Sequence, residues 1–164
     1  MIDDALRAAA RRVLDACRAR KRTVVTAESC TGGLVAAILT EIPGSSDVVD
    51  RGFVTYSDAA KQAMLDVPTQ LLQDFGAVSR ETADAMARGA LARSPADLAV
   101  SVTGIAGPGG GSAEKPVGLV HFAAASRNGD LNHRERRFGD IGRAEVRRLS
   151  VLESLAMLTE LAKG

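Results

Sequence analysis

A short run of small residues, Glu28-Ser29-Cys30-Thr31-Gly32-Gly33, places a hydroxyl where an apolar run passes into a helical pattern. A serine at such a junction can expose its hydroxyl at the edge of a sheet, while backbone N–H groups of the helix start point toward the same place. Those donors would stabilise the oxyanion that forms when the hydroxyl attacks a carbonyl carbon, and glycines let a substrate approach closely. The alternative is that Ser29 or Thr31 only caps the helix, a frequent role of these residue types.

A serine nucleophile needs a base, because its hydroxyl is a weak nucleophile on its own. The two histidines are poor candidates, since His121 falls inside a strand pattern and His133 in an arginine-rich strand, and we expect both to be structural. Lys61 is the better candidate. If Ser57 caps the helix that contains it, the lysine lies near the first turn, where the positive end of the helix lowers its pKa. The alternative is an ordinary exposed lysine.

Two neighbours of these residues also carry reactive groups. Tyr56 is the only tyrosine and ends the strand before Lys61, so its hydroxyl could orient or relay a proton between lysine and serine; the alternative is a packed aromatic ring with a solvated tip. The thiol of Cys30 near a helix start could have a lowered pKa, which makes a cysteine hydrolase a rival reading. We expect this thiol to pack inward and a Cys30→Ala variant to stay active.

A glycine-rich loop, 104–112, follows a second apolar strand and matches neither the dinucleotide fingerprint nor the Walker pattern. It is either a flexible loop or a nest of backbone N–H groups for an anion. The final helix begins with Arg143, Arg147 and Arg148, which oppose the helix dipole and would suit a bound phosphate; the alternative is a solvated charged face. A further set, expected on an exposed strand face or at a subunit contact, is Arg134, Arg136 and Arg137.

Hydrophobic periodicity predicts helices that alternate with short buried strands, which indicates a mixed α/β sheet covered by helices in a single domain, 1–164. The predicted helices are 3–19, 34–42, a short one containing Lys61, another near Leu71, 79–92 and about 143–161. The predicted strands are 23–27, 53–56, 98–103 and a hairpin of 117–125 and 131–138 across Asn128-Gly129, a strong turn dipeptide.

Composition excludes several classes of protein. Aromatic residues make up 3% of the 164 residues, which disfavours modules that stack nucleic-acid bases. The net charge of +1 gives no overall field that would attract DNA or an anionic membrane. No apolar run is long enough for a membrane span, and the charged N-terminal segment contains no signal core, so we expect a cytoplasmic protein. Cys17 and Cys30 have no metal-ligand spacing and allow one disulfide at most.

Taken together, five segments resemble the CinA C-terminal domain family, also called nicotinamide-nucleotide amidohydrolases. The matching segments are Ala27-Glu28-Ser29-Cys30-Thr31-Gly32-Gly33, Gly52-Phe53-Val54-Thr55-Tyr56-Ser57 with Lys61, Gly76-Ala77-Val78-Ser79, Ser101-Val102-Thr103-Gly104-Ile105-Ala106-Gly107-Pro108 and Lys115-Pro116-Val117-Gly118. They run in order through nearly the whole chain, and each contains specific residue types.

The resemblance implies a three-layer α/β/α sandwich with a mixed, mostly parallel five-stranded sheet. It implies hydrolysis of the carboxamide of nicotinamide mononucleotide to nicotinate mononucleotide and ammonia, in pyridine nucleotide salvage, without a metal or an organic cofactor. Ser29 would be the nucleophile, Lys61 the general base and Tyr56 a helper in the proton path. The implied substrate-binding residues are Cys30, Thr31 and Gly32 near the oxyanion, Thr103, Gly104, Ala106 and Gly107 along the nucleotide, and Arg143 at the phosphate. A homodimer is also implied.

The sequence departs from the family pattern in two places. Many relatives carry an N-terminal molybdopterin-binding-like domain for which 164 residues leave no room. The familiar Gly-Asp-Arg is replaced by Gly139-Asp140-Ile141-Gly142-Arg143, so the phosphate role of Arg143 rests on a looser match. The rival function is a non-catalytic nucleotide- or anion-binding module, which would use the same glycine-rich pocket without needing Ser29 or Lys61.

Overall fold

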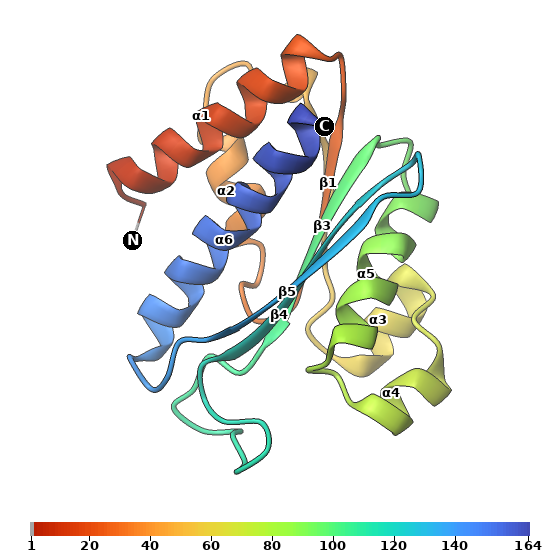
Figure 1. Cartoon of the computed structure of the whole chain (residues 1–164), viewed down its shortest axis with the longest axis vertical. Helices are drawn as coiled ribbons and strands as arrows, with labels where there is room; N and C mark the ends of the chain where they lie inside the picture. Colours follow the sequence, from red (N-terminus) through yellow and green to blue (C-terminus); the bar gives the residue numbers. More distant parts are fainter. Residues whose placement is uncertain (1) are drawn as a thin grey trace.

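A computed structural model describes residues 2–164 and shows three layers (Figure 1). A five-stranded sheet lies in the middle, with α1, α2 and α6 on one face and α3, α4 and α5 on the other. The helices are α1 (Asp4–Ala19), α2 (Leu34–Thr40), α3 (Asp58–Leu65), α4 (Thr69–Phe75), α5 (Arg80–Ala92) and α6 (Arg143–Lys163), with a 3-10 turn η1 (Ser45–Asp47). The strands are β1 (Val24–Glu28), β2 (Val49–Val54), β3 (Leu98–Gly104), β4 (Leu119–Ser126) and β5 (Leu131–Arg137).

The strand order is β2-β1-β3-β4-β5. β1 pairs in parallel with both β2 and β3, whereas β4 runs antiparallel to β3 and β5. Four strands therefore point one way and only β4 is reversed, which confirms the mixed, mostly parallel sheet and the three-layer sandwich. Because β1, β2 and β3 are parallel, they end at the same edge of the sheet, where α/β proteins commonly bind ligands.

Burial on both faces explains why the central strands contain few polar residues. All residues of β1 and β4 are buried, and neighbouring positions of β3 point to opposite cores. Val100 packs under α1, α2 and α6, while Ala99 packs under α5. Among residues 2–164, no helix combines the length and apolarity that a membrane crossing requires.

Element boundaries differ from the prediction mainly at the edge of the sheet. β2 runs from Val49 to Val54 rather than over 53–56, because its register places Val54 beside Glu28 and leaves Thr55 and Tyr56 beyond the strand. Its exposed Asp50 and Arg51 also hide it from a search for apolar runs. The turn η1 was not predicted. The hairpin is confirmed, and its turn uses the positive φ of 104° at Gly129.

Candidate active site

Ser29 and Lys61 meet at the shared edge of β1 and β3. Ser29 is the first residue after β1, and its N–H donates to the carbonyl of Val102 on β3 at 2.9 Å. Lys61 lies in the first turns of α3, which Ser57 caps as predicted. The Nζ of Lys61 lies 3.3 Å from the Oγ of Ser29 and donates to the carbonyl of Thr55 at 3.0 Å. The base and the nucleophile suggested by the sequence are thus in direct contact.

The environment of Lys61 favours its neutral form. Its side chain is 1% exposed, and this burial lowers the pKa of the ammonium group. The carboxylate of Asp58, 4.0 Å from Nζ, acts in the opposite direction. Burial, which the sequence argument did not anticipate, is therefore the main cause of the lowered pKa, and a neutral lysine can accept a proton from Ser29.

The helix-cap interpretation of Ser29 and Thr31 is wrong, because Glu28 performs that role. The Glu28 carboxylate accepts hydrogen bonds from the N–H groups of Gly33, Val35 and Ala36 at 2.9–3.0 Å, and from the hydroxyl of Thr31 at 2.7 Å. The expectation that the first N–H groups of α2 point at the substrate is also wrong, since Glu28 occupies them.

A cavity of about 240 Å³ opens in front of Ser29 and Lys61. Its lining includes most of the expected site residues together with two that were not expected, Ala77 and Val78. The full lining is Ser29, Cys30, Tyr56, Lys61, Ala77, Val78, Thr103, Gly104, Ala106 and Arg143. This volume lies somewhat below the usual range for small-molecule sites, and the open side adds space for a ligand that reaches solvent.

Three expected binding residues lie outside this lining. The carbonyl of Gly107 accepts a hydrogen bond from Arg143 at 3.0 Å, so this residue supports the arginine. The carbonyl of Thr31 accepts one from Arg147 at 2.9 Å. Gly32, with a positive φ of 60°, lies beside the same Arg147 side chain.

Arg143 and Tyr56 meet at the mouth of the cavity. The Nη2 of Arg143 donates to the hydroxyl of Tyr56 at 2.9 Å, and the tyrosine is 61% exposed. Because Lys61 contacts Ser29 directly, no tyrosine is needed to relay a proton between them. Of the three arginines at the start of α6, only Arg143 lines the cavity. Arg147 donates to the carbonyl of Thr31, and Arg148 pairs with Asp3.

Cys30 packs inward, as expected. Its side chain is 5% exposed and belongs to the core between the sheet and α2. Burial raises the pKa of the Cys30 thiol to about 12, so the thiol stays protonated at neutral pH and is a poor nucleophile. Cys17 is also buried, and both cysteines are free.

The remaining polar candidates have structural partners. The rings of His121 and His133 contact each other through Nδ1 and Nε2 at 3.0 Å, which agrees with structural roles. Arg136 and Arg137 lie on the exposed face of β5, as expected, whereas Arg134 is partly buried. Arg134 and Arg136 also form ion pairs with Glu153 of α6. Within residues 2–164, no cluster of three or more acidic, histidine or cysteine side chains could hold a metal ion.

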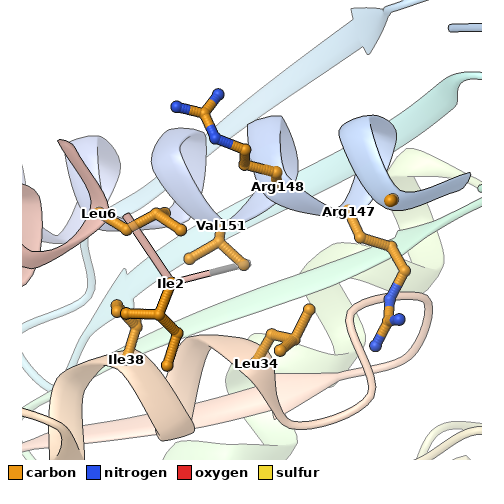
Figure 2. Close-up of a pocket in the computed structure, with 8 residues that line it drawn as sticks. Ile2, Leu6, Leu34, Ile38, Arg147, Arg148 and Val151 are labelled. Atoms are coloured by element: carbon orange, nitrogen blue, oxygen red, sulfur yellow. The ribbon is translucent and has the colours of Figure 1, made fainter. Parts of the chain in front are cut away.

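A second hollow lies between α1, α2 and α6, on the opposite face of the sheet from α3–α5 (Figure 2). Apolar side chains such as Leu6, Leu34, Ile38 and Val151 surround it, and its volume is about 20 Å³. That space is comparable to a single water molecule. It is a packing gap and offers no room for a nucleotide.

Sequence reasoning missed Glu28 and Thr55. The signal for Glu28 was a carboxylate at the end of an apolar strand, a position where a charge is rarely buried without a purpose. The signal for Thr55 was weaker: its carbonyl holds Lys61, while its buried hydroxyl has no partner among the described residues. Every residue has a backbone carbonyl, so the sequence does not indicate which carbonyl binds a side chain.

Comparisons with known proteins agree with this architecture. The family model described as "CinA C-terminal domain" matches residues 6–162. The chain is 49% identical over 96% of its length to nicotinamide-nucleotide amidohydrolase PncC of Escherichia coli K12, covering 95% of that protein. The crystal structure of the competence/damage inducible protein CihA from Agrobacterium tumefaciens matches with a TM-score of 0.96, 58% identity and 98% coverage of both chains.

Other relatives are longer. A CinA-like protein of Synechococcus sp. RCC307 is 52% identical over 89% of the chain, but this match covers 35% of that relative. A putative competence-damage inducible protein of Symbiobacterium thermophilum is 60% identical over 66% of the chain and 25% of its own length. The chain therefore spans about a third or less of these curated relatives.

Proposed function

The chain belongs to the CinA C-terminal domain family, and we propose that it is an amidohydrolase that converts nicotinamide mononucleotide to nicotinate mononucleotide and ammonia. The observation that carries this proposal is the contact between the buried Nζ of Lys61 and the Oγ of Ser29 at the floor of an open cavity. The 49% identity to a nicotinamide-nucleotide amidohydrolase over nearly the whole of both chains supports the choice of substrate.

The proposed reaction begins when the Oγ of Ser29 attacks the carboxamide carbon while neutral Lys61 takes the hydroxyl proton. The carbonyl oxygen becomes an oxyanion, and we assign the N–H groups of Cys30 and Thr31, next to the nucleophile, as its hydrogen-bond donors. When the tetrahedral intermediate collapses, the protonated Lys61 gives its proton to the leaving nitrogen. Ammonia departs, and the nicotinate group stays bound to Ser29 as an ester.

Water then completes the cycle. Lys61 removes a proton from the water that attacks the ester, and the Ser29 oxygen regains a proton as nicotinate mononucleotide leaves. Arg143 lies at the cavity mouth, and we propose that its positive charge binds the 5′-phosphate of the substrate. The reaction needs no redox change and uses only groups of the protein and water.

The alternative is a module that binds a nucleotide or another anion without chemistry. Such a module would use the cavity and Arg143, but it would gain nothing from a buried lysine with a lowered pKa against a serine hydroxyl. That pairing is unfavourable for stability, because burying an amine removes it from water. It therefore favours catalysis.

The decisive experiment measures ammonia release by the purified protein from nicotinamide mononucleotide, nicotinamide riboside, free nicotinamide and NAD. We expect turnover of the mononucleotide, a much weaker reaction with the riboside that lacks the phosphate, and none in Ser29→Ala. Full activity of Ser29→Ala would refute the serine mechanism. Substrate binding without turnover by the wild-type protein would establish the binding module instead.

Two further proposals follow from the family. We propose a homodimer, to be tested by light scattering of the purified protein, and a cytoplasmic role in pyridine nucleotide salvage, to be tested by fractionation and metabolite measurement in a deletion strain. A monomer at micromolar concentration would refute the first proposal, and unchanged levels of nicotinamide mononucleotide would refute the second.

A further inference from the structure

The carboxylate of Glu28 is one of the most buried charged groups in the described part of the protein, at 1% exposure. It accepts hydrogen bonds from five groups: the hydroxyls of Thr26 and Thr31 and the N–H groups of Gly33, Val35 and Ala36. Burial of a carboxylate is unfavourable unless all its oxygens are satisfied. A serine or aspartate at the usual cap position would close the helix start without that penalty. The arrangement therefore points to a task beyond capping.

Arg147 reaches the same turn from the other side. Figure 2 shows its side chain leaving α6 toward the turn between β1 and α2, whereas the side chain of Arg148 points the other way. The Nη2 of Arg147 donates to the carbonyl of Thr31 at 2.9 Å, and its buried Nε has no partner among the described residues. Arg147 lies four residues after Arg143, so both project from one face of α6.

Thr31 is thus held at two points, its hydroxyl by Glu28 at 2.7 Å and its carbonyl by Arg147 at 2.9 Å. Two fixed points on one residue restrict the orientation of the peptide units on either side of it. Those units carry the N–H groups of Thr31 and Gly32. The Gly32 N–H in turn donates to the carbonyl of Ser29 at 3.0 Å, which restrains the neighbouring peptide unit that carries the Cys30 N–H. The main chain of Glu28 also accepts the N–H of Thr55 at 2.8 Å, and the carbonyl of Thr55 holds Lys61.

We propose that Glu28 and Arg147 are positioning residues that together fix Thr31 and so aim the Cys30 and Thr31 N–H groups at the substrate oxyanion. This inference rests on the proposed amidohydrolase function. The two side chains act without touching substrate.

The first test replaces Arg147 by methionine, which keeps an unbranched apolar stem and removes the donor. We expect kcat to fall about tenfold to a hundredfold, as for small displacements of catalytic groups, with less than about a threefold change in KM. Arg148→Met is the matched control, because Arg148 is the next residue on the same helix and pairs with Asp3 and Glu145. It should keep the wild-type kcat.

A chemical rescue separates positioning from general stability. In Arg147→Ala, guanidine at millimolar concentration, far below denaturing levels, should restore part of kcat by donating to the Thr31 carbonyl. It should have no such effect on the wild-type protein or on Arg148→Met. An equal loss of kcat in Arg147→Met and Arg148→Met, or a wild-type kcat in Arg147→Met, would overturn the proposal.

The second test uses the hydrogen bonds of Glu28. Thr31→Val removes the hydrogen bond of 2.7 Å to Glu28 from the turn that follows Ser29. Thr26→Val removes the hydrogen bond of 3.2 Å to Glu28 from β1. We expect a lower kcat for Thr31→Val and Glu28→Gln and an unchanged kcat for Thr26→Val. Equal losses in both threonine variants would show that Glu28 serves only the fold.

A readout that needs no turnover keeps this inference apart from the proposed function. If the wild-type protein releases no ammonia from any nucleotide, the proposed function fails, but the amide ¹H–¹⁵N signals of Cys30 and Thr31 still report the geometry of the turn. These signals should shift in Arg147→Met and Glu28→Gln and stay in place in Arg148→Met. Unchanged signals in the first two variants would overturn the positioning role.

Discussion

The guanidinium of Arg143 donates a hydrogen bond of 2.9 Å to the hydroxyl of Tyr56, although the two residues are 87 positions apart in the chain. This bond joins the start of α6 to the segment between β2 and α3 across the mouth of the cavity. It restrains an exposed arginine whose other donor is held by the carbonyl of Gly107 at 3.0 Å. A restrained guanidinium loses less entropy when it binds a phosphate.

Tyr56→Phe should therefore weaken substrate binding more than chemistry. Loss of one hydrogen bond, about 1 kcal/mol, predicts an increase in KM of about fivefold with kcat within about twofold of wild type. Steady-state kinetics with nicotinamide mononucleotide measure both constants. The opposite result, a lower kcat at unchanged KM, would place Tyr56 in the proton path.

Lys61→Met should remove the base while keeping most of the side-chain volume. We expect kcat to fall about a thousandfold, within the range attributed to general bases, while the dissociation constant of the mononucleotide changes by less than about tenfold. Calorimetry with the variant measures binding, and the ammonia assay measures turnover. Turnover near the wild-type rate at saturating substrate would exclude lysine as the base.

The pH profile should show one group that must lose a proton. Burial lowers the pKa of Lys61, so activity should rise with pH through a midpoint below that of an ordinary lysine. Asp58 raises the pKa of Lys61 by its negative charge, so Asp58→Asn should move this midpoint to lower pH. Rate measurements across the pH range for the wild-type protein and Asp58→Asn test the direction of this shift. A shift to higher pH would contradict it.

Cys30→Ala should remain active. Its thiol is buried in the core, and its pKa of about 12 keeps it protonated. We expect kcat within about threefold of wild type and a loss of stability of about 1–2 kcal/mol, as for removal of a small buried group. Urea unfolding measures the loss of stability. A folded Cys30→Ala protein without activity would make Cys30 the nucleophile.

Gly104→Ala tests the packing of the cavity wall. A Cβ at this position would lie 2.7 Å from the Cγ2 of Val120 and 2.8 Å from the carbonyl of Leu119. Because a neighbouring backbone atom cannot move aside freely, we expect a loss of about 1–3 kcal/mol in unfolding free energy. Gly129→Ala is a comparison at an uncrowded turn, where only the positive φ disfavours the side chain. Equal stability of Gly104→Ala and wild type would contradict this packing.

The sequence predicted what depends on local pattern. Apolar periodicity located the central strands and the long helices, and the turn dipeptide located the hairpin. Ser29 and Lys61 were paired on the argument that a nucleophile needs a base, and the structure brings them into contact. These predictions succeeded because they rest on residue type and short-range spacing.

Long-range contacts were beyond the reach of such patterns. The ion pairs of Arg134 and Arg136 with Glu153 depend on how β5 packs against α6, which spacing does not reveal. The burial of Lys61 arises from the fold around α3, so the cause of its lowered pKa could not be identified in advance. The role of Glu28 depends on three N–H groups that every residue except proline could offer.

The position of Arg143 and Arg147 late in the chain affects when the site is completed during synthesis of the protein. Ser29 and Lys61 are translated before Arg143 and Arg147, which follow Lys61 by more than eighty residues. Domains generally fold as units during translation. A nascent chain that already carries Ser29 and Lys61 therefore still lacks the arginine at the cavity mouth and the arginine that donates to the carbonyl of Thr31. If these arginines act as proposed, full activity requires that α6 has docked against the sheet.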